Sequence, residues 1–426
     1  MSPGALPGFR DFYPTELAER SFIFGGWREV ARRFGFVEYD GPPLEPLELY
    51  TRKSGAEIVE QLYNFTDKGK REIALRPEMT PTLARMVAAR ANAMRKPVRW
   101  FSIPQLFRYE RAQRGRLREH FQLNMDIIGE ADVSADAELV AAAIDAMRVF
   151  GLTSADVVAR VSDRRLLNAL LRGVGIEDAQ LGAAYAALDK LDRDPRDVLE
   201  QRLAAAGVSS ASAARLFELA GAAANEDAFA RLVREAGASA EYDVVRRYLE
   251  HTQALGVRDW IRLDLSIVRG LAYYTGIVFE LFDAQGELRA ICGGGRYDTL
   301  LESLGGVSLP ALGFGMGDVV LGELLRARGK MPAPMPAVDV WVAYGERGNV
   351  ETAMRVAARL RERGRSVEYA LGSQKLARQL KAAHAAGARE TVVVATPELA
   401  DGEAMVRRMA DGAEEKVELD SWIANA

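Results

Sequence analysis

The sequence predicts an α+β amino-terminal region that is interrupted by a helical insertion and followed by a smaller α/β domain. Three observations support this fold class. Strand and hairpin patterns precede residue 150 and return after residue 260. Ala, Leu and Arg with helical periodicity dominate residues 162–251. Strands and helices then alternate from Val338 onward, which is typical of an α/β sheet.

The amino-terminal region begins with a predicted helix, Thr15 to Phe34, with Thr15 as its N-cap and Gly35 at its end. Strand and helix patterns then follow in a clear order. The predicted elements are a strand (36–39), a hairpin (61–66 with 72–76), a helix (78–89), a strand pair (100–103 and 121–129) and a helix (136–150).

After the insertion, strands are predicted at 261–265 and 277–282. The glycine-rich stretch 293–298 is interpreted as a turn that leads to a short helix, and Gly313 to Gly317 as the opening of another helix. The alternating strands 338–343, 367–370 and 391–395 and helices 350–363 and 374–385 predict a mainly parallel sheet. The expected domains are a first domain formed by 1–161 and 252–328, the insertion 162–251, a proline-rich linker 329–337, and a carboxy-terminal domain 338–426.

Composition limits the function classes. The chain has 426 residues and a net charge of −4, so any nucleic-acid binding must come from local patches. A single cysteine, Cys292, excludes an internal disulfide framework and fits a reducing, cytoplasmic location; its apolar surroundings predict a buried, inert thiol. The three histidines are scattered and do not have the spacing of an ordinary zinc site, so no metal site built from protein side chains is expected. Neither a signal peptide nor an apolar run of about 20 residues is found, so no membrane association is expected.

The most informative segment holds five arginines within eleven positions, 108–118. Strand-like sequences flank it on both sides, so a hairpin would direct several arginines toward one place. Because the guanidinium fork matches phosphate oxygens in pairs, this segment predicts a site for a polyphosphate, a nucleic-acid backbone or both.

Six segments in order resemble one family, the histidyl-tRNA synthetases of the class II aminoacyl-tRNA synthetase superfamily. The resemblance runs from Pro7 to the carboxyl terminus and is weakest in the helical insertion. The six segments are 35–42 (motif 1), Leu-Arg-Pro-Glu-Met-Thr at 75–80, 107–122 (motif 2), Val-Arg-Gly-Leu-Ala-Tyr-Tyr at 268–274, Gly-Gly-Arg-Tyr-Asp at 294–298, and 313–317 (motif 3).

The resemblance implies an antiparallel sheet flanked by helices, and an enzyme that activates L-histidine with ATP and Mg²⁺ and transfers it to histidine tRNA. No tightly bound cofactor is implied. Arg108 and Arg269 would be catalytic and neutralise charge at the α-phosphate. The residues that would bind ATP are Arg108, Glu110, Arg116 and His120.

The same resemblance assigns the amino-acid pocket. Glu78, Thr80 and Gln122 would hold the ammonium group, and Asp126 would accept an imidazole N–H where the family usually has glutamate. The other residues implied to bind histidine are Arg269, Tyr273, Tyr274 and Tyr297.

Partners follow from the resemblance as well. The carboxy-terminal domain resembles the family's anticodon-binding domain, and motif 1 implies a homodimer. The residues expected to contact tRNA are Arg114, Arg118, Lys375 and Arg378.

Three positions depart from the family pattern. Val320 stands where motif 3 usually places an arginine that stacks on adenine, and His120 stands where motif 2 places a phenylalanine. Phe121 is displaced by one residue, which on a strand means the opposite face. Ala272 replaces an aspartate, and Arg326 or Arg328 is a candidate for the missing positive charge.

Two other readings stay open on these residues. One is a histidine-sensing regulatory subunit of ATP phosphoribosyltransferase, which would lack the carboxy-terminal domain. The other is a paralogue that only binds RNA or protein. The retained arginines Arg108, Arg116 and Arg269 and the segment after Val338 favour the ligase.

Overall fold

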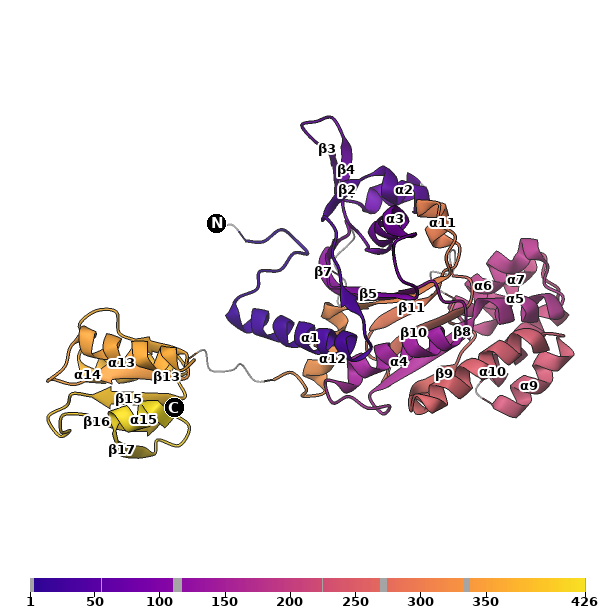
Figure 1. Cartoon of the computed structure of the whole chain (residues 1–426). Helices are drawn as coiled ribbons and strands as arrows, with labels where there is room; N and C mark the ends of the chain where they lie inside the picture. Colours follow the sequence, from indigo (N-terminus) through magenta and orange to yellow (C-terminus); the bar gives the residue numbers. More distant parts are fainter. Residues whose placement is uncertain are drawn as a thin grey trace. The chain divides into compact units, whose positions relative to one another are not determined.

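The computed structural model describes residues 4–54, 56–109, 117–223, 225–268, 274–332 and 338–425. These residues form two compact units, Met1–Pro332 and Ala333–Ala426, which are drawn in Figure 1. None of the described helices is long and apolar enough to cross a membrane.

The first unit contains a large sheet and a small one. Its strands are β1 (Val37–Glu38), β2 (Leu44–Pro46), β3 (Asn64–Thr66), β4 (Glu72–Leu75), β5 (Val98–Ser102), β6 (Gln105–Phe107), β7 (Glu119–Ile128), β8 (Val157–Asp163), β9 (Ile261–Leu263), β10 (Ile277–Asp283), β11 (Cys292–Arg296) and β12 (Ala311–Gly317).

Helices surround these sheets. The α-helices are α1 (Pro14–Arg33), α2 (Glu48–Ser54), α3 (Thr80–Arg90), α4 (Ser134–Arg148), α5 (Arg164–Gly173), α6 (Leu181–Asp189), α7 (Arg196–Ala205), α8 (Ser210–Ala222), α9 (Glu226–Glu235), α10 (Ser239–Ala254), α11 (Leu300–Gly305) and α12 (Asp318–Ala327). Short 3₁₀ helices occupy Ala56–Gln61, Asp178–Gln180 and Arg258–Trp260.

The main sheet has nine strands in the described residues, in the order β1-β5-β7-β12-β11-β10-β8-β9, with β6 paired to β7. The neighbours from β5 to β8 pair antiparallel, and only the outer pairs β1–β5 and β8–β9 are parallel. The predicted antiparallel sheet is therefore confirmed. Strands β2, β4 and β3 form the small sheet, which contains the predicted hairpin.

Two glycine-rich stretches that were expected to be a turn and a helix start are strands instead. β11 carries Gly293 to Gly295, and β12 carries Gly313, Gly315 and Gly317. Glycine ordinarily weakens a strand, but it is required where neighbouring atoms approach closely. A Cβ on Gly313 would lie 2.0 Å from Asp126 Oδ1, and one on Gly294 would lie 2.4 Å from Phe314 Cβ.

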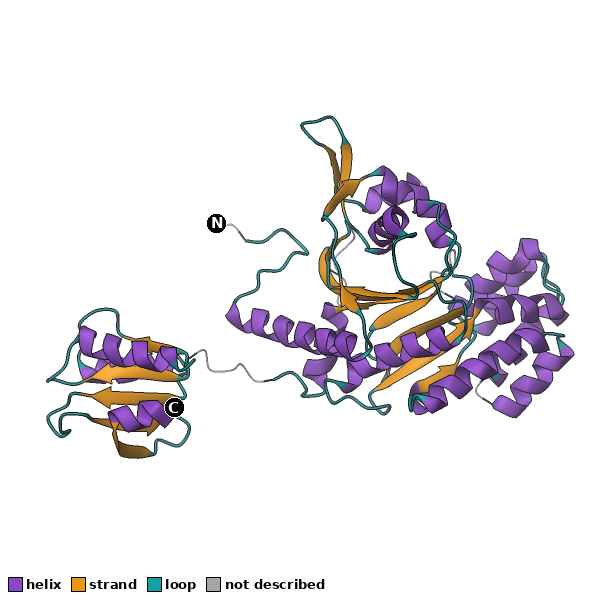
Figure 2. Cartoon of the chain, viewed as in Figure 1, coloured by secondary structure: helices purple, strands orange, loops and turns teal. Residues whose placement is uncertain are grey.

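Helices cover both faces of the main sheet (Figure 2). α4 and α12 contact β7 and β12, and α1 packs against both helices. On the other side, α2, α3 and α11 contact one another. α1 begins with Pro14 at its first turn and with Tyr13 as N-cap, so the predicted N-cap at Thr15 is wrong. Proline suits this position because its missing N–H would have no helical partner.

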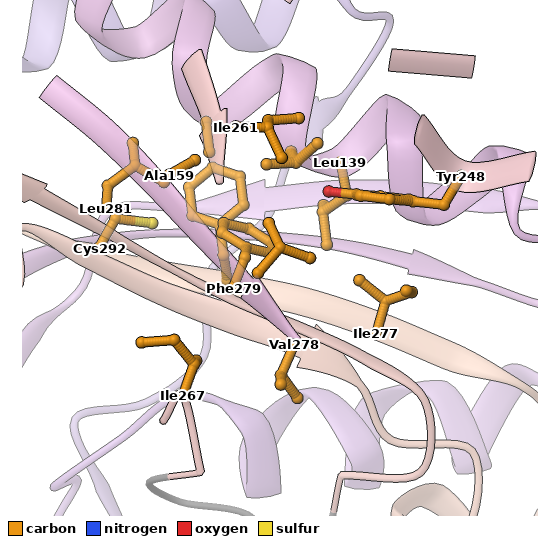
Figure 3. Packing of buried hydrophobic residues seen from close by; sticks show 14 of the residues in the cluster. Leu139, Ala159, Tyr248, Ile261, Ile267, Ile277, Val278, Phe279, Leu281 and Cys292 are labelled. Atoms are coloured by element: carbon orange, nitrogen blue, oxygen red, sulfur yellow. The ribbon is translucent and has the colours of Figure 1, made fainter. Parts of the chain in front are cut away.

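The helices α5 to α10 share a continuous core with the sheet. Tyr248 of α10, Leu139 of α4 and Phe279 of β10 belong to one hydrophobic cluster, and Figure 3 draws them among its buried side chains together with Cys292. β8 leads into these helices: the Asp163 carboxylate accepts hydrogen bonds of 2.9 Å from the backbone N–H groups of Arg165 and Leu166, which caps α5.

The second unit is a mixed sheet with helices. Its elements are β13 (Val340–Tyr344), α13 (Val350–Glu362), β14 (Val367–Tyr369), α14 (Leu376–Ala385), β15 (Glu390–Val394), β16 (Glu403–Arg408), β17 (Glu414–Glu418) and α15 (Leu419–Asn425). β14, β13 and β15 are parallel, as predicted, but β16 and β17 add antiparallel pairs, so the sheet is not mainly parallel. β16 and β17 were not predicted from the sequence because they are rich in charged residues.

Candidate active site

Two adjoining cavities lie over the antiparallel strands β7, β11 and β12. The first, here named the acidic cavity, measures about 260 Å³ and is lined by Glu78, Thr80, Arg108, Gln122, Asn124, Asp126, Tyr274, Gly293, Tyr297, Gly313, Phe314 and Gly315. The second, named the His120 cavity, measures about 310 Å³ and is lined by Arg108, Leu117, His120, Gln122, Glu280, Arg289, Ala290, Ile291, Cys292, Gly293, Gly315, Gly317, Val319 and Val320.

The two cavities share Arg108, Gln122, Gly293 and Gly315. The absence of a side chain at Gly315 makes room for Gln122, because a Cβ on Gly315 would lie 2.7 Å from the Gln122 side chain. A ligand that occupies both cavities would pass Arg108 at their junction. The Arg108 guanidinium donates a 3.1 Å hydrogen bond from Nε to Pro77 O, and its positive charge can neutralise negative charge at this junction.

Asp126 is the buried acid of the acidic cavity. It lies on β7 opposite Gly313 of β12, and its Oδ1 accepts a hydrogen bond from the Tyr297 hydroxyl. Burial raises the pKa of Asp126 to about 7, and the Tyr297 hydrogen bond opposes that rise. An N–H donor placed against this carboxylate would therefore meet a group that readily exchanges a proton near neutral pH.

The short loop after β4 carries Glu78 into the same cavity, and Thr80 lines it as the first residue of α3. Arg76 anchors this loop: it is buried, and its Nη1 donates hydrogen bonds of 2.7 Å to Asp40 Oδ1 and to Gly41 O. Its Nε donates to Gln105 O at 3.1 Å. Glu78 is thus held on the rigid edge where β4 passes into α3.

The His120 cavity presents a flat ring beside aliphatic walls. His120 lies near the start of β7. Burial, and to a smaller extent the positive charge of Arg108, lower the pKa of His120 to about 4. The imidazole is therefore neutral at pH 7. Leu117, Val319 and Val320 line the cavity with it.

Phe121 lies on the other face of β7, as its displacement by one residue predicts. It packs against Phe12 and Phe24, with ring centroids 6.1 and 5.2 Å away, and the Arg20 guanidinium lies 4.7 Å from its centroid. His120 alone therefore faces the cavity from this pair.

Arg10 connects the amino-terminal segment to both sides of the His120 cavity. Its Nε donates to Glu119 Oε1 at 2.6 Å, and its Nη1 donates to Asp318 Oδ2 at 2.9 Å. Asp318 also accepts a 2.9 Å hydrogen bond from the Phe121 backbone N–H. This bridge ties the beginning of β7 to the first residue of α12, and the sequence patterns did not indicate it.

The two arginines suggested as substitutes for a motif 3 cation do not line the His120 cavity. Arg326 donates to Glu19 Oε2 at 2.6 Å, and Arg328 donates to Asp283 Oδ1 at 2.6 Å. Arg289 and Glu280 line this cavity instead, and sequence reasoning missed both. Arg289 lies in the loop before β11 and belongs to no motif, so no sequence signal indicated it.

Several expected site residues lie outside the described part of the chain: Glu110, Arg114, Arg116, Arg269 and Tyr273. Arg118 is described, and its guanidinium lies 4.6 Å from the centre of the Tyr109 ring. Lys375 and Arg378 are exposed; Lys375 is the N-cap of α14 and Arg378 lies in its first turn.

Cys292 is buried, as predicted, and burial raises the pKa of its thiol well above the usual value. Among the described side chains, no group of three or more His, Cys, Asp or Glu residues is placed to hold a metal ion.

Comparison with known proteins identifies the family. Residues 8–317 match the model of the family described as histidyl-tRNA synthetase, and residues 339–425 match the anticodon binding domain. A histidine–tRNA ligase of Opitutus terrae is 45% identical over 416 residues, which is 97% of this chain and 95% of that protein. The chloroplastic/mitochondrial histidine–tRNA ligase of Arabidopsis thaliana is 40% identical over 97% of this chain and 84% of that protein.

Solved structures agree on the fold. The crystal structure of histidyl-tRNA synthetase from Nostoc sp. PCC 7120 matches with a TM-score of 0.86 at 23% identity, and covers 100% of this chain and 99% of that one. An ATP phosphoribosyltransferase regulatory subunit/histidyl-tRNA synthetase from Bacillus halodurans C matches with a TM-score of 0.77 at 22% identity, covering 94% of this chain and 100% of that chain. The family match over most of the chain and the near full-length relatives together show that this chain belongs to the histidyl-tRNA synthetase family.

Proposed function

We propose that the chain is a histidine–tRNA ligase. In the first step, a carboxylate oxygen of histidine attacks the α-phosphorus of ATP, the bond to the bridging oxygen breaks, and pyrophosphate leaves. In the second step, the terminal ribose hydroxyl of histidine tRNA attacks the carbonyl carbon, loses its proton, and AMP leaves.

One observation carries this proposal: the acidic cavity and the His120 cavity meet at Arg108. The acidic cavity suits an amino acid with a basic ring, since Glu78 can attract the ammonium group and Asp126 can accept an imidazole N–H. The His120 cavity suits a nucleotide. Their common wall is where the carboxylate and the α-phosphate would react, and a fixed cation there stabilises the added negative charge.

The roles of the remaining residues follow from the cavity walls. Thr80 and Gln122 assist in holding the ammonium group, and Tyr274 and Tyr297 bound the histidine ring. Arg116 and Arg269 would neutralise the phosphates, with Mg²⁺ entering as the ion of the ATP substrate. The motif sequences that contain Arg116 and Arg269 support these two roles.

The division into domains is part of the same proposal. Residues 1–161 and 252–328 form the catalytic domain, 162–251 an insertion and 338–426 the anticodon-binding domain. The exposed Lys375 and Arg378 on α14 are proposed contacts to the tRNA backbone.

A homodimer through motif 1 also belongs to this proposal. β1 is an edge strand of the main sheet, and its apolar residue Val37 is 62% exposed. Leu44, at the start of the following strand β2, is 40% exposed. Burying such side chains against a second copy is favourable. Light scattering should give twice the 46.7 kDa of the chain, and Val37→Lys should shift the mass toward the monomer. A monomeric wild-type protein would contradict the dimer.

The decisive test is histidine-dependent exchange of pyrophosphate into ATP. The wild-type protein should exchange with histidine and not with other amino acids, and should charge histidine tRNA. Arg108→Ala should lower the exchange rate about a hundredfold, the typical effect of removing one preorganised charge-stabilising group. Arg231→Ala, which removes an exposed arginine of α9, is the matched control and should leave it unchanged.

Absence of exchange in a wild-type protein that still binds histidine would overturn the ligase and favour a regulatory subunit. Present observations do not favour that alternative, because the second unit matches the anticodon binding domain and the curated relatives described above are named as ligases.

A further inference from the structure

Arg289 occupies a position on the wall of the His120 cavity that the motif pattern does not explain. It lines the cavity together with Ala290 and Ile291, immediately before β11. Val319 and Val320, in the first turn of α12, line the same cavity. Arg289 therefore shares this cavity with the start of α12.

This end of the cavity is built for a flat, largely apolar group. Val319, Val320 and Leu117 present aliphatic surface, and the neutral ring of His120 presents an aromatic one. A purine ring has two apolar faces and a polar rim, which fits such a slot. The phosphates of the same nucleotide are expected at the other end, because Arg108 and Gly293 mark the junction with the acidic cavity.

A guanidinium group is the natural partner for a purine face. It is planar, weakly hydrated and attracted to the π-electrons of an aromatic ring. Val320, on the same wall, carries no charge, and Arg326 and Arg328 do not line this cavity. Among the described lining residues of the His120 cavity, Arg108 and Arg289 are the two arginines, and Arg108 lies at the junction.

We propose that Arg289 stacks on the nucleobase of ATP and thereby supplies, from the segment before β11, the cation that motif 3 lacks at Val320. This proposal deepens the proposed ligase function and rests on it for the identity of the nucleotide. Arg289 is then a substrate-binding residue, and its side chain is exposed where the base enters.

The test is direct binding, measured by calorimetry on the full-length protein with three probes: ATP with Mg²⁺, AMP, and inorganic tripolyphosphate. Arg289→Ala should weaken ATP and AMP binding about tenfold, equivalent to about 1.4 kcal/mol, and leave tripolyphosphate binding unchanged. Arg289→Lys should restore only part of the loss, because lysine keeps the charge but not the plane. Arg231→Ala is the control for loss of one positive charge at the surface.

Two results would overturn the role of Arg289: unchanged ATP and AMP affinity in Arg289→Ala, or a loss of tripolyphosphate affinity as large as that of ATP, which would place the guanidinium on the phosphates. Pyrophosphate exchange separates this inference from the proposed function. If the wild-type protein exchanges pyrophosphate and Arg289→Ala keeps both its exchange rate and its ATP affinity, only the role of Arg289 is refuted. If the wild-type protein shows no exchange but its ATP and AMP binding depends on Arg289, only the ligase function is refuted.

Discussion

Replacing Asp126 by asparagine tests the electrostatics of the acidic cavity. This substitution is nearly isosteric, and the asparagine carbonyl can still accept the hydrogen bond from the Tyr297 hydroxyl. It removes only the ability to carry a negative charge. We expect Asp126→Asn to make the folded protein more stable at alkaline pH while it weakens histidine binding.

The magnitude follows from the pKa. Burial raises the pKa of Asp126 from the ordinary 3.8 to about 7. A carboxyl group whose pKa is higher in the folded state gives its full stabilisation below pH 3.8, and this is lost as the pH rises to about 7. Asparagine does not ionise, so the variant escapes the loss. With about 1.36 kcal/mol for each pKa step, the variant should exceed the wild type by about 2 kcal/mol at pH 5 and about 4 kcal/mol at pH 8.

Urea unfolding at pH 5 and pH 8 measures this difference for the wild type, Asp126→Asn and the control Asp197→Asn, which changes an exposed aspartate of α7. Calorimetry at pH 8 should show histidine binding about tenfold weaker in Asp126→Asn, because a charge-assisted hydrogen bond becomes a neutral one. An advantage of the variant that is equal at both pH values, or a variant less stable than wild type at pH 8, would refute this account of the buried carboxylate.

Two further substitutions test the glycine and the ion pair that support the cavities. Gly313→Ala should abolish measurable histidine binding, because its Cβ would lie 2.0 Å from Asp126 Oδ1. Gly182→Ala, which has open space around the new Cβ, is the control. Unimpaired histidine binding in Gly313→Ala would contradict this prediction. Asp136→Ala should lower the free energy of unfolding by about 3 kcal/mol, because the buried Arg296 loses a carboxylate that it contacts through Nε and Nη2. Unfolding in guanidinium chloride measures this difference, and a loss under about 1 kcal/mol would contradict the prediction.

Much of the first unit could be predicted from local patterns. Hairpins such as β3–β4 and helices such as α3 and α4 arise from turn residues and periodic apolar positions, which a sequence displays directly. The acidic cavity was also anticipated, because the family motifs name Glu78 and Asp126 and the fold then brings these residues together.

Other features depend on neighbours that are distant in the chain. β11 and β12 resemble turns because they are rich in glycine, and the need for Gly313 becomes visible only when Asp126 lies across from it. Arg289 belongs to no motif, and only the folded structure shows that it lines the His120 cavity. β16 and the edge strand β17 of the second sheet are rich in charged residues, so hydrophobic alternation did not reveal them.

The bridge formed by Arg10 has a practical consequence for protein engineering. The segment before α1 also accepts a 3.0 Å hydrogen bond from Arg118 N at Gly8 O, so it is attached to the strand that carries His120. A truncated version starting at α1 would keep every described residue that lines the two cavities, yet it would leave the buried Glu119 and Asp318 without their cation. A preparation clipped by proteases between Arg10 and Pro14 would therefore lack the cation that pairs with these two carboxylates.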